Sequence, residues 1–111
     1  MKPLVIIESP FAGDVDANIA YARKCVADSV HRGEAPIASH LLFTQPGILD
    51  DLVPGERALG IEAGLAWYRV ADKCAVYMDR GVSSGMRTGI ERARAHGLDP
   101  EVRYIGREVA A

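Results

Sequence analysis

Apolar and polar positions follow two different periods along the first third of the chain. Residues 3–8 (PLVIIE) form a continuous apolar run with β-branched residues, which predicts a strand buried on both faces. From Asp14 to Val30, apolar residues recur every three or four positions, so an amphipathic helix is expected there, and Gly33 ends it. Residues 35–39 are again short and apolar and predict a second strand.

The second half of the chain repeats this alternation. A turn-rich connection over residues 43–56 leads into a helix from Pro54 to Val70 that is apolar on more than one side. We expect this helix to pack both on the sheet and on another element, such as a second subunit. Gly60 and Gly64 permit a close approach of backbones on one of its faces. Three elements complete the pattern: a strand at 73–79, a helix that starts at Ser83 or Ser84 and ends at Gly97, and a strand at 101–106.

The predicted elements therefore alternate in the order β-α-β-α-β-α-β. Short connections between alternating strands and helices imply a parallel sheet with helices on both faces, because the crossovers are right-handed. The expected fold class is α/β: a small doubly wound parallel sheet of flavodoxin-like or Rossmann-like type. At 111 residues, with no internal repeat or linker, the chain is expected to form a single domain over residues 1–111.

Charge and cysteine content narrow the possible partners. The formal net charge is -2, so no attraction to polymeric nucleic acid or to an anionic membrane is expected. No apolar run approaches the roughly 20 residues of a membrane span. The N-terminal run is too short for the core of a signal peptide, so the protein is expected to be cytoplasmic. Cys25 and Cys74 lie far apart and predict two buried, reduced thiols; no metal and no cofactor are expected.

Open parallel α/β sheets bind ligands beyond the carboxyl ends of their strands, so the segments that follow each of the four predicted strands, the tail included, are candidate ligand-binding regions. The loop after the first strand (ESPFAGD) places Ser9 and Gly13 ahead of a helix N-terminus, and is interpreted either as an anion site or as an ordinary turn. It is neither a dinucleotide fingerprint nor a Walker loop. His40 follows the second strand and is interpreted as a structural residue, a base-stacking wall or an acid–base group.

The loop after the third predicted strand carries more polar chemistry. Asp79 at the strand end can accept hydrogen bonds from ribose hydroxyls, and Ser83, Ser84 and Gly85 offer hydroxyl and N–H groups at a helix start. A cation in the first turn of a helix opposes the helix dipole. Arg87 therefore indicates either a bound phosphate or a solvated side chain.

Three segments, VIIESPFAGD, ADKCAVYMD and GVSSGMRTGIERARAHG, resemble the nucleoside 2-deoxyribosyltransferase-like superfamily, which includes deoxynucleoside monophosphate N-glycosidases. The resemblance covers most of the chain in order. It implies that the loop with Ser83 and Ser84 holds sugar hydroxyls or a 5′-phosphate, and that Gly85 and Gly97 bound a helix that carries a glutamate nucleophile. Asp79 matches the acidic residue at the strand end.

The nucleophile position implied by this resemblance, four residues after Gly85, is Gly89 in this chain. Glu91 lies about 200° further round the helix, and in the alternative interpretation it forms an ion pair with Arg87 or Arg94. Cleavage of an N-glycosidic bond passes through an oxocarbenium-like sugar that a carboxylate stabilises or attacks. Three arrangements stay open: a carboxylate supplied by Glu91, Glu56 or Glu62; Asp79 activating water; or a pocket that binds a nucleotide without cleaving it.

The resemblance implies an N-glycosidase or deoxyribosyltransferase acting on a nucleoside or nucleotide; the alternative is a non-catalytic nucleotide-binding protein. The candidate catalytic residues are Glu91 and Asp79. The candidate ligand-binding residues are Ser9, Phe11, Gly13, His40, Ser83, Ser84, Gly85 and Arg87, with Phe11 and His40 flanking the base. A homodimer or higher homo-oligomer is expected through the helix at residues 54–70.

Overall fold

The computed structural model describes residues 1–106 as alternating strands and helices. In chain order the elements are β1 (Leu4–Glu8), α1 (Val15–His31), β2 (Ala35–Ile37), α2 (Ser39–Leu42), α3 (Pro54–Ala66), the 3-10 helix η1 (Trp67–Arg69), β3 (Lys73–Tyr77), α4 (Ser84–Ala95) and β4 (Pro100–Arg103).

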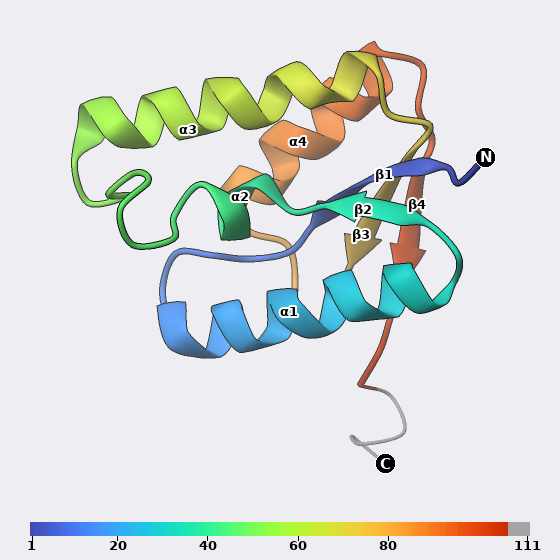
Figure 1. Cartoon of the computed structure of the whole chain (residues 1–111), viewed down its shortest axis with the longest axis horizontal. Helices are drawn as coiled ribbons and strands as arrows, with labels where there is room; N and C mark the ends of the chain where they lie inside the picture. The colour runs from blue at the N-terminus through green and yellow to red at the C-terminus, as the bar shows by residue number, and fades with distance from the viewer. Residues whose placement is uncertain (107–111) are drawn as a thin grey trace.

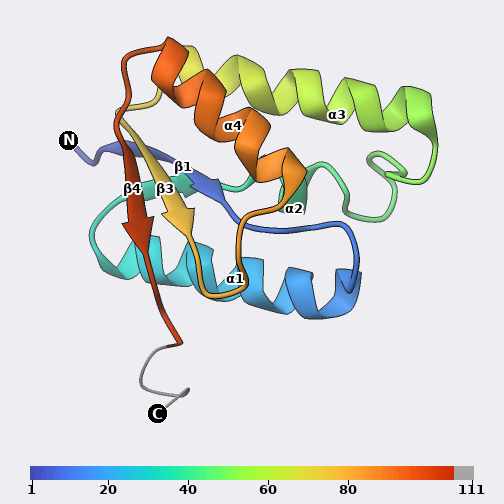
Figure 2. The ribbon, with the colours of Figure 1, turned by 180° about the vertical axis from the view of Figure 1, so that it is seen from behind.

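The four strands form one parallel sheet in the order β2-β1-β3-β4, with β1 and β3 in the middle. Helix α1 covers one face of the sheet, and α4 covers the other with α3 on the same side (Figures 1 and 2). The predicted doubly wound, flavodoxin-like α/β fold is confirmed. Because β1, β2 and β3 are parallel neighbours, their carboxyl ends lie at the same end of the sheet, and the loops that follow them meet there.

The central strands are buried on both faces, as the unbroken apolar run of β1 predicts. Val5 and Ile7 pack in the core beneath α1, whereas Ile6 lies in the opposite core beneath α4. Each core also contains one free cysteine, Cys25 on the α1 side and Cys74 on the α4 side, and both are fully buried. The expectation of two buried thiols is confirmed for these residues.

Helix boundaries follow from side-chain caps and glycines. The Asp14 carboxylate accepts a hydrogen bond from the Ala17 N–H at 3.3 Å and caps α1, and the Ser83 hydroxyl accepts from the Met86 N–H at 3.2 Å and caps α4. Two glycines with positive φ follow the helices that they end: Gly33 at +86° and Gly97 at +77°.

The second strand is shorter than predicted. It ends at Ile37, and residues Ser39–Leu42 form the short helix α2 instead of the end of the strand. The chain turns into a helix here because the Ala38 carbonyl accepts hydrogen bonds from the backbone N–H groups of Leu41 and Leu42. Helix α2 then packs on α3 where Gly64 leaves room: a Cβ atom at Gly64 would lie 2.8 Å from the Ser39 Cβ. The expected close approach is therefore confirmed, and α2 is the partner.

Helix α3 is more exposed than predicted. Gly64 is its single buried residue, and apolar side chains on it face solvent, among them Leu59 (58% exposed) and Ile61 (45% exposed). Trp67 and Val70, just beyond the helix, are about half exposed as well. Within the single chain, Leu65 packs against the core and Gly64 against α2. Burial of the remaining apolar residues depends on the oligomer expected through residues 54–70, which stays a prediction.

That oligomer has a direct test. We expect the protein to run as a dimer or larger species in light scattering, and the double variant Leu59→Lys, Ile61→Lys to run as a monomer with unchanged circular dichroism, because a charge is costly to bury in an apolar interface. Val30→Lys, which changes a similarly exposed apolar residue on α1, serves as control and keeps the wild-type mass. A monomeric wild-type protein would contradict the prediction.

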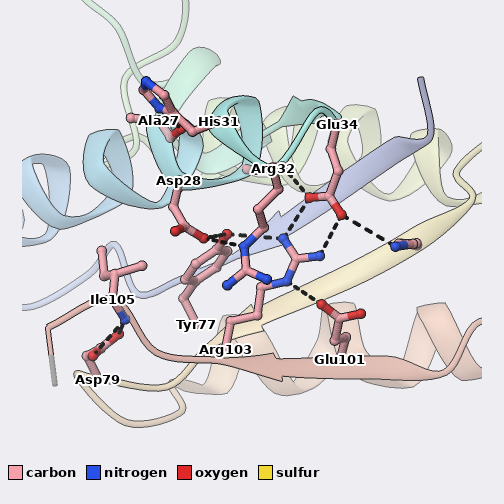
Figure 3. Close-up of polar contacts among 12 residues, drawn as sticks. Ala27, Asp28, His31, Arg32, Glu34, Tyr77, Asp79, Glu101, Arg103 and Ile105 are labelled. Carbon is pink, nitrogen blue, oxygen red and sulfur yellow. Dashed lines mark hydrogen bonds and ion pairs between the residues drawn. The ribbon is translucent and has the colours of Figure 1, made fainter. Parts of the chain in front are cut away.

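A buried ion pair links the edges of the sheet beneath α1 (Figure 3). The Arg103 guanidinium, at the end of β4, donates to both carboxylate oxygens of Glu34 at 2.7 Å each, and also to the Tyr77 hydroxyl at 3.2 Å. Glu34 accepts a third hydrogen bond from the Ser29 hydroxyl at 2.8 Å. The Arg103 hydrogen bonds hold the pKa of Glu34 at about 2. At its rim, two half-exposed side chains complete the network: Lys73 Nζ lies 3.5 Å from Glu34 Oε2, and Arg103 Nε donates to the Glu101 carboxylate at 2.5 Å. Because the network joins β2, β3 and β4 to one another, it serves the fold.

Candidate functional site

A cavity of about 280 Å³ lies at the carboxyl edge of the sheet, between the end of β1, α2, α3 and the start of α4. Its position agrees with the rule for ligand sites in open α/β sheets. Six of the predicted ligand-binding residues line it: Ser9, Phe11, His40, Ser83, Ser84 and Gly85. The loops after β1 and β3 and the short helix after β2 thus converge as expected.

The other candidates lie outside the cavity lining. Arg87 and Glu91 are exposed on α4, and Gly13 adopts φ +100° just before the cap of α1, where its role is conformational. Among the alternative carboxylates, Glu62 is exposed and also lies outside the lining. Glu56 does line the cavity, but its carboxylate accepts a hydrogen bond from the Asp50 N–H at 3.0 Å and so holds the preceding loop.

Asp79 is engaged away from the cavity. Its carboxylate accepts a hydrogen bond from the backbone N–H of Ile105 at 3.1 Å (Figure 3). It also accepts from the Tyr21 hydroxyl at 2.5 Å and from the Gly106 N–H at 2.9 Å. Burial raises the pKa of this carboxyl, but these hydrogen bonds outweigh burial and bring the pKa below its ordinary value. In the chain as described, Asp79 therefore fastens residues 105 and 106 to the end of β3.

The cavity contains a buried carboxyl group that the sequence interpretation did not single out. Glu8, the last residue of β1, lines the cavity, is 9% exposed and accepts a short hydrogen bond from the Tyr68 hydroxyl. Burial raises the pKa of Glu8 to about 8. A signal was present in the sequence, because Glu8 is the one charged residue of an otherwise apolar strand and stands at its carboxyl end.

Glu8 lies against the backbone of Gly89. A Cβ atom built on Gly89 would overlap the Glu8 carboxylate, at 2.5 Å from Glu8 Cδ, and would also lie 2.5 Å from the Tyr68 hydroxyl. Gly89 is itself buried, so a side chain at this position could not turn outward to solvent. The carboxylate of β1 therefore occupies the volume where a side chain of residue 89 on α4 would begin.

A second polar pair lines the same cavity. The Ser9 hydroxyl lies 2.6 Å from Nε2 of His40, and Ser9 itself is buried. Burial lowers the pKa of His40 to about 4, so the imidazole is neutral at physiological pH. The loop that carries Ser9 is held by Asn18, whose side-chain amide donates to the carbonyls of Phe11 and Ala12 at 3.0 and 3.1 Å.

The cation that lines the cavity comes from α3 and not from α4. Arg57 donates to the Asp51 carboxylate at 2.9 Å, and both side chains line the cavity and are partly exposed. The sequence pattern pointed to Arg87 for this role because of its position in the first turn of a helix. The apolar lining is supplied by Phe11, Phe43, Leu49, Ile61 and Leu65.

The Glu8 carboxyl makes stability depend on pH in a defined direction. Its folded-state pKa of about 8 lies above the ordinary value of 4.5, so its stabilisation is complete below pH 4.5 and is lost as the pH rises to 8. His40 acts oppositely, because its folded-state pKa of about 4 makes stability fall as the pH drops from 6.5 to 4. Between pH 4.5 and 6.5, Glu8 and His40 change the free energy of unfolding in opposite directions. Above pH 6.5, Glu8 alone of the two still makes the free energy of unfolding depend on pH.

We therefore expect the free energy of unfolding to fall between pH 6.5 and 8, by about 1 kcal/mol per pH unit, and this decline to vanish in Glu8→Gln. Chemical denaturation at a series of pH values measures it. Glu91→Gln, which changes an exposed carboxyl outside the cavity, is the control and keeps the decline. An identical pH dependence in wild type and Glu8→Gln would contradict the prediction.

The fold and the cavity define a class: a small flavodoxin-like α/β protein with a ligand-sized cavity at the carboxyl edge of its sheet. The chain belongs to the family described as "Domain of unknown function (DUF7768)", which matches residues 3–105. A search of curated proteins found no match. None of the helices within residues 1–106 has the length and apolar character to cross a bilayer. In the same part of the chain, no three His, Cys, Asp or Glu side chains are grouped to hold a metal ion.

Proposed function

We propose that this protein cleaves the N-glycosidic bond of a nucleoside or nucleoside 5′-monophosphate, with Glu8 as the catalytic carboxylate. The observation that carries the proposal is the overlap of the Glu8 carboxylate with the Cβ position of Gly89. The resemblance to the nucleoside 2-deoxyribosyltransferase-like superfamily implies a glutamate at position 89. Here the glycine at 89 makes room for a carboxylate that comes from β1, so the cavity keeps the functional group that the reaction needs.

The proposed chemistry uses few groups. The ionised Glu8 carboxylate attacks or stabilises the anomeric carbon as the bond to the base breaks and the sugar becomes oxocarbenium-like. The Tyr68 hydroxyl, which donates to Glu8 Oε2, fixes the direction of the carboxylate. Tyr68 is buried, so its ring is held by packing, and a group held in this way keeps the geometry that reaction requires.

The lining of the cavity suits the remaining parts of such a substrate. Phe11 and Phe43 give apolar surface for a base, whereas the N-terminus of α4 at Ser83 and Ser84 offers hydroxyl and N–H groups to sugar hydroxyls or a phosphate. Arg57 is the cation available for a phosphate once it leaves Asp51. A volume of about 280 Å³ is small for a ligand pocket and favours a mononucleoside over a larger ligand.

A second candidate is a protein that binds a nucleotide without cleaving it. The observation that favours it is the burial of Glu8, because a carboxyl with a pKa of about 8 is mostly protonated at neutral pH and then donates a hydrogen bond instead of attacking. In that case the same cavity would hold its ligand through the protonated carboxyl and the apolar lining.

One experiment separates these functions. The protein is incubated at high concentration with the common ribo- and deoxyribonucleosides and their 5′-monophosphates, at pH 7 and pH 9, and free base is measured by chromatography. The proposed activity gives base release that is faster at pH 9, where Glu8 is ionised. A binding protein gives a raised melting temperature with the nucleotide recovered intact. Neither base release nor a thermal shift from any member of the panel would contradict both candidates.

A further inference from the structure

The cavity holds a second set of reactive groups besides Glu8 and Tyr68. Ser9 follows Glu8 directly in the chain, and its hydroxyl lies 2.6 Å from His40 Nε2 on α2. Both residues line the same cavity as Glu8. A serine hydroxyl at hydrogen-bond distance from an imidazole nitrogen is the arrangement in which a proton passes from oxygen to nitrogen when that oxygen is needed as a base.

We propose that Ser9 and His40 form the proton-accepting pair that activates the acceptor, a water molecule or an incoming base, in the second half of the reaction. This inference rests on the proposed function, because it requires a sugar bound covalently to Glu8. Ser9 is the member that touches the acceptor, and His40 acts through Ser9.

The step balances as follows when water is the acceptor. The water oxygen bonds to the anomeric carbon while the bond from that carbon to the Glu8 oxygen breaks, and its electron pair returns to the Glu8 carboxylate. One water proton moves to Ser9 Oγ as the Ser9 proton moves to His40 Nε2. The imidazolium then loses that proton to solvent, which restores the resting pair.

Two observations favour proton acceptance over proton donation. The buried imidazole is neutral at physiological pH, so its Nε2 is ready to accept a proton from the Ser9 hydroxyl. In addition, Nε2 is the ring nitrogen that faces the Ser9 hydroxyl at 2.6 Å. The neutral tautomer that carries its proton on Nδ1 therefore presents Nε2 to Ser9 as the acceptor. The other titratable side chains that line the cavity are Glu8, Asp51, Glu56, Arg57 and Tyr68.

The test separates the two halves of the reaction. Ser9→Ala and His40→Asn are mixed with the nucleoside that the unmodified protein cleaves best, and base release is followed from the first turnover. We expect an initial burst of about one base per chain, followed by turnover reduced about 10²-fold to 10⁴-fold. Intact-mass spectrometry is expected to show the added sugar, and peptide mapping to place it on Glu8.

Matched variants control the comparison. Ser9→Thr keeps the hydroxyl and is expected to keep at least a tenth of the wild-type turnover, which a loss of packing alone would not predict. His31→Asn changes an exposed histidine on α1 outside the cavity and is expected to behave as wild type. Circular dichroism checks that Ser9→Ala and His40→Asn are folded. Ser9→Ala removes the fewer atoms, so it carries the test if His40→Asn does not fold.

Several results would overturn the inference. An unchanged steady state in Ser9→Ala and His40→Asn, a burst lost together with turnover, or a sugar mapped to Ser9 would each show that the pair does not act as the acceptor's base. These results leave base release by wild type, and its dependence on Glu8, intact. If the unmodified protein releases no base from any member of the panel, the proposed function and this inference fail together.

Discussion

Glu8→Gln is expected to lower the rate of base release about 10³-fold or more. Glutamine has the shape of glutamate and can still accept a hydrogen bond from the Tyr68 hydroxyl, so the cavity keeps its form. An amide neither attacks the anomeric carbon nor carries the negative charge that offsets an oxocarbenium-like sugar. Initial rates of base release, measured by chromatography at subsaturating substrate, give the ratio of kcat/KM values directly.

Two carboxyls that the sequence pattern offered for the same role serve as matched comparisons. Glu62→Gln and Glu91→Gln change exposed side chains outside the cavity lining, and we expect both to keep wild-type rates within about twofold. A thermal shift by intact nucleotide in Glu8→Gln shows that the ligand still binds, which separates lost chemistry from lost binding. Wild-type rates in Glu8→Gln, or a collapse in Glu91→Gln, would place the reacting carboxyl elsewhere.

Much of the fold could be predicted from the periodicity of the chain. The unbroken run in β1 predicted a strand buried on both faces, and the structure places Val5 and Ile6 in cores on opposite sides of the sheet. The start of α4 was likewise predicted at Ser83 or Ser84, and the structure shows that Ser83 caps this helix. These features depend on residues that are near one another in the sequence, so local patterns are sufficient to find them.

The site was harder to predict, because its polar groups depend on contacts between distant segments. Asp79 was expected to face a ribose, but it accepts hydrogen bonds from Ile105 and Gly106, which only the arrangement of the sheet brings near. Glu8 and Gly89 are 81 positions apart in the numbering, and the sequence alone does not show that one occupies the space left by the other.

Helix α2 was missed for a similar reason. Four residues give too little periodicity to distinguish a helical turn from the end of a strand. What fixes this turn is its contact with α3 at Gly64, where Ser39 fits against a backbone that has no side chain. Because His40 lies on α2, its pairing with Ser9 was equally invisible in the sequence.

Moving the carboxyl to position 89, where the resemblance implies a glutamate, gives the sharpest test of the relation between Glu8 and Gly89. Gly89→Glu alone is expected to lower the free energy of unfolding by about 3 kcal/mol, because the new Cβ overlaps the Glu8 carboxylate in a buried site. Glu8→Ala alone is expected to fold and to lose base release about 10³-fold, as Glu8→Gln does. Chemical denaturation and initial rates measure the two effects.

The double variant Glu8→Ala, Gly89→Glu should recover much of both losses, because Glu8→Ala removes the two nearest atoms that overlap the new Cβ, and the third, the Tyr68 hydroxyl, lies at the far end of a side chain. We expect base release at least about tenfold above Glu8→Ala, since the glutamate then projects from α4 into the volume that Glu8 vacated.

Glu8→Ala, Thr88→Glu, with its carboxyl one position away on the same helix, is the control and should show no recovery. Purely additive effects of the two substitutions, on stability and on rate, would mean that residues 8 and 89 do not share one functional position. Recovery would instead show that the reaction needs a carboxylate at this point in space, whether the sheet or the helix supplies it.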